Sequence, residues 1–175
     1  MMKKNVRNDL LILARRHDID IEMQMEIAEC KDSYVRYVLA RNRTTHPDVL
    51  EFLSKDKKSW HVREAVAQNP NTSVKVLAFL AQDKQYEVRY AVAKNLNTTV
   101  DILMSLASDR FWGIKNAVLL NPNCSLDILV KISKDKDEYM RYKVARHAKA
   151  DKNLLAVLYL DSDPRVSFEA SKRLG

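Results

Sequence analysis

Glycine is scarce in this chain, in which Gly113 and Gly175 are the only two among 175 residues. Tight β-hairpins favour glycine because it adopts positive φ angles without steric cost, and phosphate-binding loops need it for close backbone approach. The scarcity therefore argues against a hairpin-rich sheet protein and against a glycine-based nucleotide site. It favours an all-helical fold.

Cysteines and long apolar runs are also scarce. Cys30 and Cys124 have no partner spacing, so a disulfide framework is not expected and a reducing compartment is favoured. No apolar run approaches the roughly 20 residues of a membrane span, and the start, MMKKNVRND, lacks the apolar stretch of a signal peptide. These absences predict a cytoplasmic protein without a membrane segment.

Catalytic and metal-binding patterns are missing as well. No H-E-x-x-H, C-x-x-C or G-x-S-x-G arrangement occurs, and the histidines have no metal-ligand spacing: His17, His46, His61 and His147. We therefore expect no catalytic residue, no metal and no cofactor, and predict that the protein is not an enzyme.

What the chain does contain is a repeat, and residues 83–109, DKQYEVRYAVAKNLNTTVDILMSLASD, are one unit of it. Its first half places Val88 and Ala91 at helical spacing, and its second half does the same with Leu103 and Leu106. Each half therefore predicts a short helix with one apolar face.

The segment between the two halves has turn chemistry. Asparagine tolerates the left-handed conformation at a helix end, so Asn95 is expected to end the first helix in that conformation. Threonine is a good N-cap, so Thr98 is expected to cap the second helix. One unit is predicted to be helix, turn, helix, followed by a loop at Asp109.

The unit recurs in register along the chain. Its V-R-x-x-V-A-x-N half begins at Val35, Val62, Val88, Ile114 and Met140, in steps of 27, 26, 26 and 26 residues. The closing aspartate recurs at Asp56, Asp83, Asp109, Asp135 and Asp161. We predict a single domain over residues 1–175, with a cap or irregular repeat at 1–31, five repeats at 32–161 and a half-repeat cap at 162–175.

Residues 62–72, VREAVAQNPNT, followed by a leucine-bearing helix and Asp83, resemble the leucine-rich repeat variant and, more broadly, HEAT-like helical repeats. The resemblance implies a right-handed α-solenoid of paired short helices. One type in the family carries an iron–sulfur cluster in a cysteine-rich N-terminal segment, but residues 1–31 hold only Cys30, so no cluster is expected. Proteins with HEAT-like folds include alkylpurine DNA glycosylases, so a DNA repair enzyme is the third hypothesis for function. None of the active-site residues of those enzymes can be placed in this sequence by motif.

Two charged columns follow the repeat. The first pairs the aspartates with basic residues near the start of each first helix, Arg36, Arg63, Arg89, Lys115 and Arg141. We expect a ladder in which each loop carboxylate meets the base or the backbone amides of the helix that follows it, since acids are favoured near helix N-termini. The alternative is a phosphate-binding stripe.

The second basic column comes directly after the aspartates, at Lys57, Lys84, Arg110 and Lys136. It is either a solvated loop edge or a basic ridge for DNA or RNA. A net charge of +7 and a pI of about 9.4 are compatible with an anionic partner of either kind, nucleic acid or acidic protein.

Aromatic and apolar side chains outside the leucine positions are further candidates for binding. The tyrosines of one column, Tyr37, Tyr90 and Tyr142, are expected to be exposed beside basic positions, whereas Trp60, Tyr86 and Trp112 either pack between repeats or contact a partner. A third set lies off the leucine stripe of the second helices and either lines a groove for a partner or is covered by the superhelix: Phe52, Phe79, Met104 and Val130. The first hypothesis for function is a scaffold that binds a protein, as an adaptor or inhibitor, and the second is binding of nucleic acid.

Overall fold

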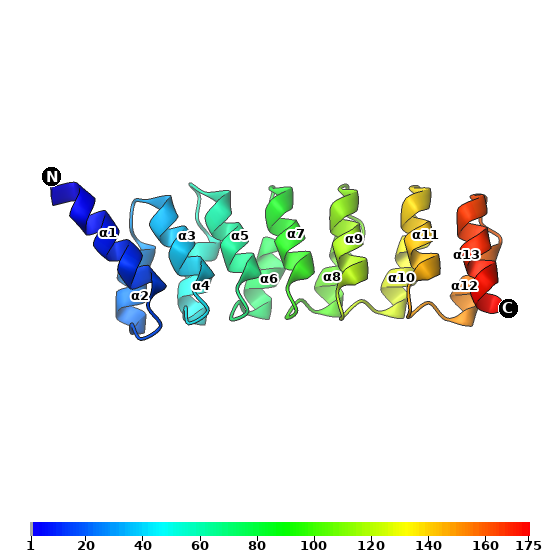
Figure 1. Cartoon of the computed structure of the whole chain (residues 1–175), viewed down its shortest axis with the longest axis horizontal. Coiled ribbons are helices and arrows are strands. Elements are labelled where there is room, and N and C mark those ends of the chain that lie inside the picture. The colour runs from blue at the N-terminus through cyan, green and yellow to red at the C-terminus, as the bar shows by residue number, and fades with distance from the viewer. Residues whose placement is uncertain (1) are drawn as a thin grey trace. The chain divides into compact units, whose positions relative to one another are not determined.

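The computed structural model describes residues 2–175, with side chains from Val6 onward, and within that range it contains thirteen helices and no strand (Figure 1). The predicted all-α solenoid of short helix pairs is confirmed. The chain forms two compact units, here called the N-terminal unit (Met1–Thr98) and the C-terminal unit (Thr99–Gly175). The single-domain organisation and the right-handed superhelix remain predictions.

The N-terminal unit consists of three helix pairs and one further first helix: α1 (Met2–Arg15), α2 (Ile21–Ala28), α3 (Ser33–Arg41), α4 (Pro47–Ser54), α5 (Trp60–Gln68), α6 (Val74–Leu80) and α7 (Tyr86–Lys94). The first helices α1, α3, α5 and α7 contact one another in sequence order, and the second helices α2, α4 and α6 do the same. Residues predicted as an irregular repeat or cap, 1–31, thus include a helix pair, α1 and α2.

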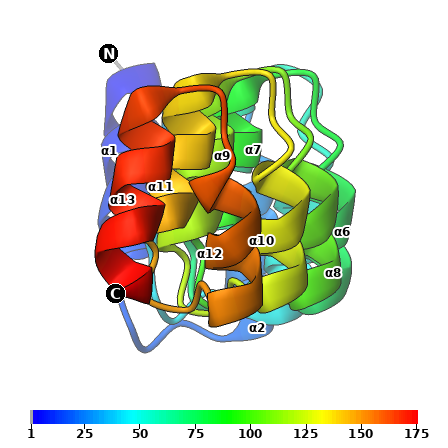
Figure 2. The ribbon, with the colours of Figure 1, turned by 90° about the vertical axis from the view of Figure 1, so that its right-hand side faces the viewer.

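The C-terminal unit consists of three pairs in which the second helix comes first in the chain: α8 (Val100–Leu106), α9 (Trp112–Leu120), α10 (Leu126–Ile132), α11 (Glu138–Arg146), α12 (Lys152–Tyr159) and α13 (Pro164–Leu174). Here α9, α11 and α13 form one layer, and α8, α10 and α12 form the other (Figure 2).

The apolar positions of the second helices, predicted for one unit at Leu103 and Leu106, form the core throughout both compact units. Leu50, Leu53, Leu77 and Leu80 are buried in the N-terminal unit, and Leu103, Leu106, Leu129, Ile132, Leu155 and Leu158 in the C-terminal unit. Because a helix of seven to nine residues is marginal alone, this burial between neighbouring pairs supplies most of its stability.

The asparagines that end the first helices do not adopt the predicted left-handed conformation. No described residue has a positive φ angle; Asn69, for example, has φ −71° and ψ 131°, in the extended region. Its side-chain amide instead donates to the carbonyls of Ala40 and Asn42 in the preceding repeat, at 2.7 and 2.8 Å. The prediction was wrong because acceptors from another repeat outweigh the local preference of asparagine.

The same position joins successive pairs throughout each unit. Asn42 donates to Ala14 and Arg16, so the first helix pair is attached in the same way as the predicted repeats. In the C-terminal unit Arg173 holds this position and donates to the carbonyls of Ala145 and His147, both at 2.8 Å. The lateral hydrogen bonds therefore extend to both terminal pairs.

Thr98 is not an N-cap. The cap of α8 is Thr99, whose side chain makes no capping hydrogen bond, while the Thr98 hydroxyl donates to the Val92 carbonyl at 2.6 Å. Thr45 and Thr72 make the equivalent bond to carbonyls at the ends of α3 and α5. The turn threonine thus closes the preceding helix, because buried carbonyls there need a donor.

Candidate binding surface

The predicted ladder exists, but its arginines meet different carboxylates from those expected. The Arg63 guanidinium pairs with Asp83, twenty residues later, at 2.5 and 3.0 Å, and donates to the main-chain carbonyl of Asp56, seven residues earlier, at 2.7 Å. The same pairing with the aspartate of the same repeat is found for Arg36–Asp56, Lys115–Asp135 and Arg141–Asp161. The loop after each second helix therefore folds back onto the first helix of its own repeat.

The ladder carboxylates also accept backbone amides, as predicted. Asp83 accepts the amide of Gln85 at 2.9 Å. Burial would raise the pKa of Asp83, but the hydrogen bonds from Arg63 and from this amide outweigh burial and lower the pKa below its ordinary value. With most of their surface covered, the ladder bases serve the fold and are not available as a phosphate-binding stripe.

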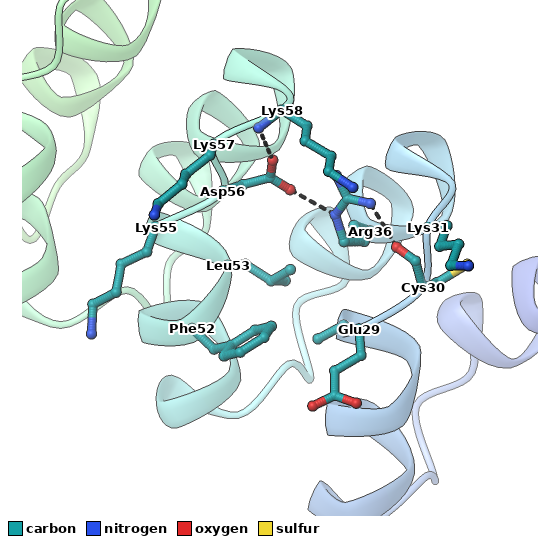
Figure 3. Close-up of a pocket in the computed structure, with 11 residues that line it drawn as sticks. Glu29, Cys30, Lys31, Arg36, Phe52, Leu53, Lys55, Asp56, Lys57 and Lys58 are labelled. Atoms are coloured by element: carbon teal, nitrogen blue, oxygen red, sulfur yellow. Dashed lines mark hydrogen bonds and ion pairs between the residues drawn. The ribbon is translucent and has the colours of Figure 1, made fainter.

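A pocket of about 380 Å³ opens in the N-terminal unit between the end of α2 and the α4–α5 loop (Figure 3). The Arg36–Asp56 pair lies on one side of it, and Phe52 and Glu29 on the other. Phe52 lies in α4 one residue before the buried Leu53, so its ring cannot join the core and remains 45% exposed. This pocket is called the Phe52 pocket below.

Lysines surround the Phe52 pocket. We call Lys31, Lys57 and Lys58 the lysine rim: all three line the pocket and are exposed. Within the described residues no ion pair involves any of them, because Asp56 is engaged by Arg36 and by the backbone amides of Lys58 and Ser59. The charged lining residues without an ion pair are therefore these three lysines and Glu29, so positive charge predominates in the pocket.

The four apolar candidates of the second helices occupy two positions of the repeat rather than one. Phe52 in α4 and Phe79 in α6 each precede the second buried leucine of their helix, and Phe79 is 56% exposed. Helices α4 and α6 contact each other. Met104 and Val130 follow the first leucine in α8 and α10, and both are at least partly exposed. Met104 and Val130 therefore do not continue the position held by the two phenylalanines. The sequence prediction grouped all four residues because the leucine spacing alone does not separate these two positions.

The second basic column is exposed in both units, with Lys57 and Lys84 in the N-terminal unit and Arg110 and Lys136 in the C-terminal unit. Sequence reasoning treated this column and the apolar positions as alternatives. The structure brings one member of each, Lys57 and Phe52, into a single pocket. Lys31 comes from a different repeat, so no pattern within one repeat could have identified it.

The tyrosine column is partly exposed. Tyr90 is exposed, whereas Tyr37 and Tyr142 are half-buried. Each ring carries a cation from four residues later in the same helix, Arg41, Lys94 and Arg146, at 5.8, 5.5 and 5.6 Å from the ring centroid. The i, i+4 spacing of these pairs was visible in the sequence, although no prediction used it.

Trp60, the first residue of α5, stacks on His61 with ring centroids 3.7 Å apart, and Trp112, the first residue of α9, is exposed.

In the described part of the chain no three His, Cys, Asp or Glu side chains are grouped as metal ligands would be. Over the same residues, no helix is both long and apolar enough to cross a membrane.

Comparisons with known proteins include a likeness to a solved structure. No protein-family model matches the chain, and no curated protein matches it. The structure is similar to a solved protein described as a leucine-rich repeat variant with a novel repetitive protein structural motif. The two are 20% identical with a TM-score of 0.45, over 94% of this chain and 75% of the other. This is the kind of protein that the repeat pattern resembles.

Proposed function

We propose that this chain is a non-catalytic repeat scaffold that binds a protein partner at the Phe52 pocket. The bound segment carries an aliphatic or aromatic side chain flanked by acidic residues. The observation that supports this most directly is the partly exposed Phe52 ring beside a lysine rim without ion pairs.

The exposed ring supplies affinity. Burying a phenylalanine side chain completely is worth about 1.5–3 kcal/mol, so covering the remaining 45% of Phe52 contributes about 1 kcal/mol. Large aromatic side chains at the centre of an interface are frequent hot spots. A pocket of about 380 Å³ accommodates a few side chains of an extended segment.

The lysine rim selects the charge of the segment. Lys31, Lys57 and Lys58 line the pocket from two repeats, so an acidic segment that enters the pocket would meet cations from both. Complementary charge raises the rate of association and disfavours basic competitors, and salt weakens this contribution.

The test is selection of peptides from a random display library, followed by affinity measurements on the selected peptides. Two substitutions use residues that the repeat already accommodates: Phe52→Ser, because Ser105 holds that position in α8, and Lys58→Gln, because Gln85 holds the position before α7. Phe52→Ser is expected to weaken binding about fivefold, as 1 kcal/mol predicts.

Lys136→Gln is the matched control, since it removes one exposed loop charge in the C-terminal unit and leaves the pocket intact. Selected peptides should be acidic with an apolar anchor and should bind this control as tightly as the original chain. Basic or uncharged peptides, or equal affinity for Phe52→Ser and the original chain, would refute the proposal.

A further inference from the structure

One ten-residue pattern occurs twice in the chain, once in each unit. Residues 32–41, DSYVRYVLAR, and 137–146, DEYMRYKVAR, share the form D-x-Y-x-R-Y-x-x-A-R. The fold accounts for three of the shared residues. The aspartate is the N-cap of α3 and of α11, the first arginine belongs to the ladder, and the alanine is buried. The two tyrosines and the last arginine have no such role.

The helices between the two copies show that the repeat does not require those tyrosines and arginines. At the same three positions, in order, α5 has His61, Glu64 and Gln68, α7 has Glu87, Tyr90 and Lys94, and α9 has Gly113, Asn116 and Leu120. All three helices nevertheless form the same first-helix structure. The repeat fold therefore does not require the full set found in α3 and α11.

The two copies also have the same geometry. The rings of Tyr34 and Tyr37 stack with centroids 6.0 Å apart at 23°, and those of Tyr139 and Tyr142 with centroids 6.2 Å apart at 23°. In each copy the arginine covers the second ring and donates to its hydroxyl, Arg41 to Tyr37 at 3.1 Å and Arg146 to Tyr142 at 3.2 Å. Both arginines and both first tyrosines are exposed. Each first ring also has a cation beside it, Arg7 at 5.9 Å from the Tyr34 centroid and Lys143 at 5.2 Å from the Tyr139 centroid.

Each copy borders a basic cavity without carboxylates. In the N-terminal unit a cavity of about 350 Å³ is lined by Tyr34, Tyr37 and Arg41 together with Arg15, His17 and Arg43. In the C-terminal unit a cavity of about 530 Å³ between α9 and α11 is lined by Lys143, Arg146, His147 and Lys149; of the second copy, the arginine lines it and the two tyrosines do not. Neither lining contains an aspartate or glutamate.

We propose that these two tyrosine–arginine sites bind single-stranded nucleic acid. Exposed aromatic rings stack on unpaired bases with little dependence on sequence, and adjacent cations hold the phosphates. A duplex keeps its bases stacked inside and cannot offer them to the rings, and an acidic protein would use the cations but has no need of the stacked tyrosine pairs. The sites share no residue with the Phe52 pocket, so the inference does not depend on the proposed protein binding.

The experiment compares fluorescence polarisation of two labelled single strands of about 16 nucleotides, one with bases and one abasic, which carry the same number of phosphates. The full chain is expected to bind the strand with bases at least about tenfold more tightly, because stacking contributes beyond charge. An equally long duplex and polyglutamate serve as competitors and should compete poorly.

The variants again use residues that the repeat already contains. Tyr37→Asn with Tyr142→Asn copies Asn116 of α9 and should reduce affinity for the strand with bases to that for the abasic strand. Arg41→Gln with Arg146→Gln copies Gln68 of α5 at the first site and should weaken binding of both strands. Circular dichroism checks that each double variant remains helical.

The control removes the same number of charges elsewhere. Lys84→Gln with Lys136→Gln alters the exposed loop edge of each unit and should leave the preference for bases unchanged. Equal affinity for the two strands would overturn the proposal, as would a loss in this control equal to that of the arginine variant. Effective competition by polyglutamate would overturn it in favour of an acidic protein partner.

Discussion

Replacing Asn69 with alanine is expected to lower the free energy of unfolding by about 3 kcal/mol, at about 1 kcal/mol for each of three hydrogen bonds lost. Its amide donates to Ala40 and Asn42 at 2.7 and 2.8 Å, and its side-chain oxygen accepts the amide of Asn71 at 2.9 Å. The side chain is 2% exposed, so water cannot replace these partners without rearrangement.

Asn71→Ala provides a control with the same chemical change in a different environment. The Asn71 amide also donates to the preceding repeat, to Arg43 at 2.6 Å and Thr45 at 3.3 Å, but the residue is exposed. Water can take over these bonds, so the loss should stay below about 1 kcal/mol. Burial, rather than the number of bonds, is expected to separate the two variants.

The assay is urea unfolding at pH 7 followed by far-ultraviolet circular dichroism, with linear extrapolation to water. The denaturant slope must be compared between variants, because repeat arrays can unfold in parts. Asn69→His should lie between the original chain and Asn69→Ala, since His147 holds this position in α11 with its Nε2 2.9 Å from the Leu119 carbonyl. Equal losses in Asn69→Ala and Asn71→Ala would refute the role assigned to the buried amide.

Four further outcomes are expected. Asp83→Asn leaves Arg63 without its charged partner and should lower the free energy of unfolding by about 3 kcal/mol in the same assay. A double-mutant cycle with Arg63→Met that shows no coupling energy would contradict the pairing. The folded-state pKa of Asp83 lies below its ordinary value of 3.8, so the stabilisation from the ion pair is complete above about pH 5 and is lost as the pH falls through 3.8 and below. Over an acid titration, Asp83→Asn should therefore lose less stability than the original chain. Burial raises the pKa of the Cys124 thiol to about 11, so a thiol reagent at pH 8 should label Cys30 first, and fast labelling of both would contradict this. Cys124→Thr should raise the free energy of unfolding by about 1 kcal/mol, since Thr72 at this position donates to a helix-end carbonyl at 2.5 Å, and a lower melting temperature would count against it.

The buried positions could be predicted because they follow from local geometry. Residues three and four apart lie on one face of a helix whatever that helix packs against, so the columns of Leu50 and Leu53 identified the core before any contact was known. The i, i+4 pairs such as Tyr37 with Arg41 are local in the same sense.

The partners of polar side chains could not be predicted, because they come from elsewhere in the chain. Arg63 has aspartates both before and after it, and only the path of the loop after α6 makes Asp83 its partner. Asn69 was expected to adopt a left-handed turn from its own preference, yet carbonyls of the preceding repeat hold it extended. In both cases acceptors from a distant segment decided the outcome.

The sequence by itself determined the helical class, the repeat length and the register of the buried faces, because each depends on spacing along one short helix. The tertiary structure alone decided which exposed groups meet. It brought Lys31 of one repeat and Phe52 of the next into one pocket, and it set Arg41 of α3 and Arg146 of α11 in the linings of separate basic cavities. Contacts between helices depend on how the helices pack, and spacing along one helix carries no information about them.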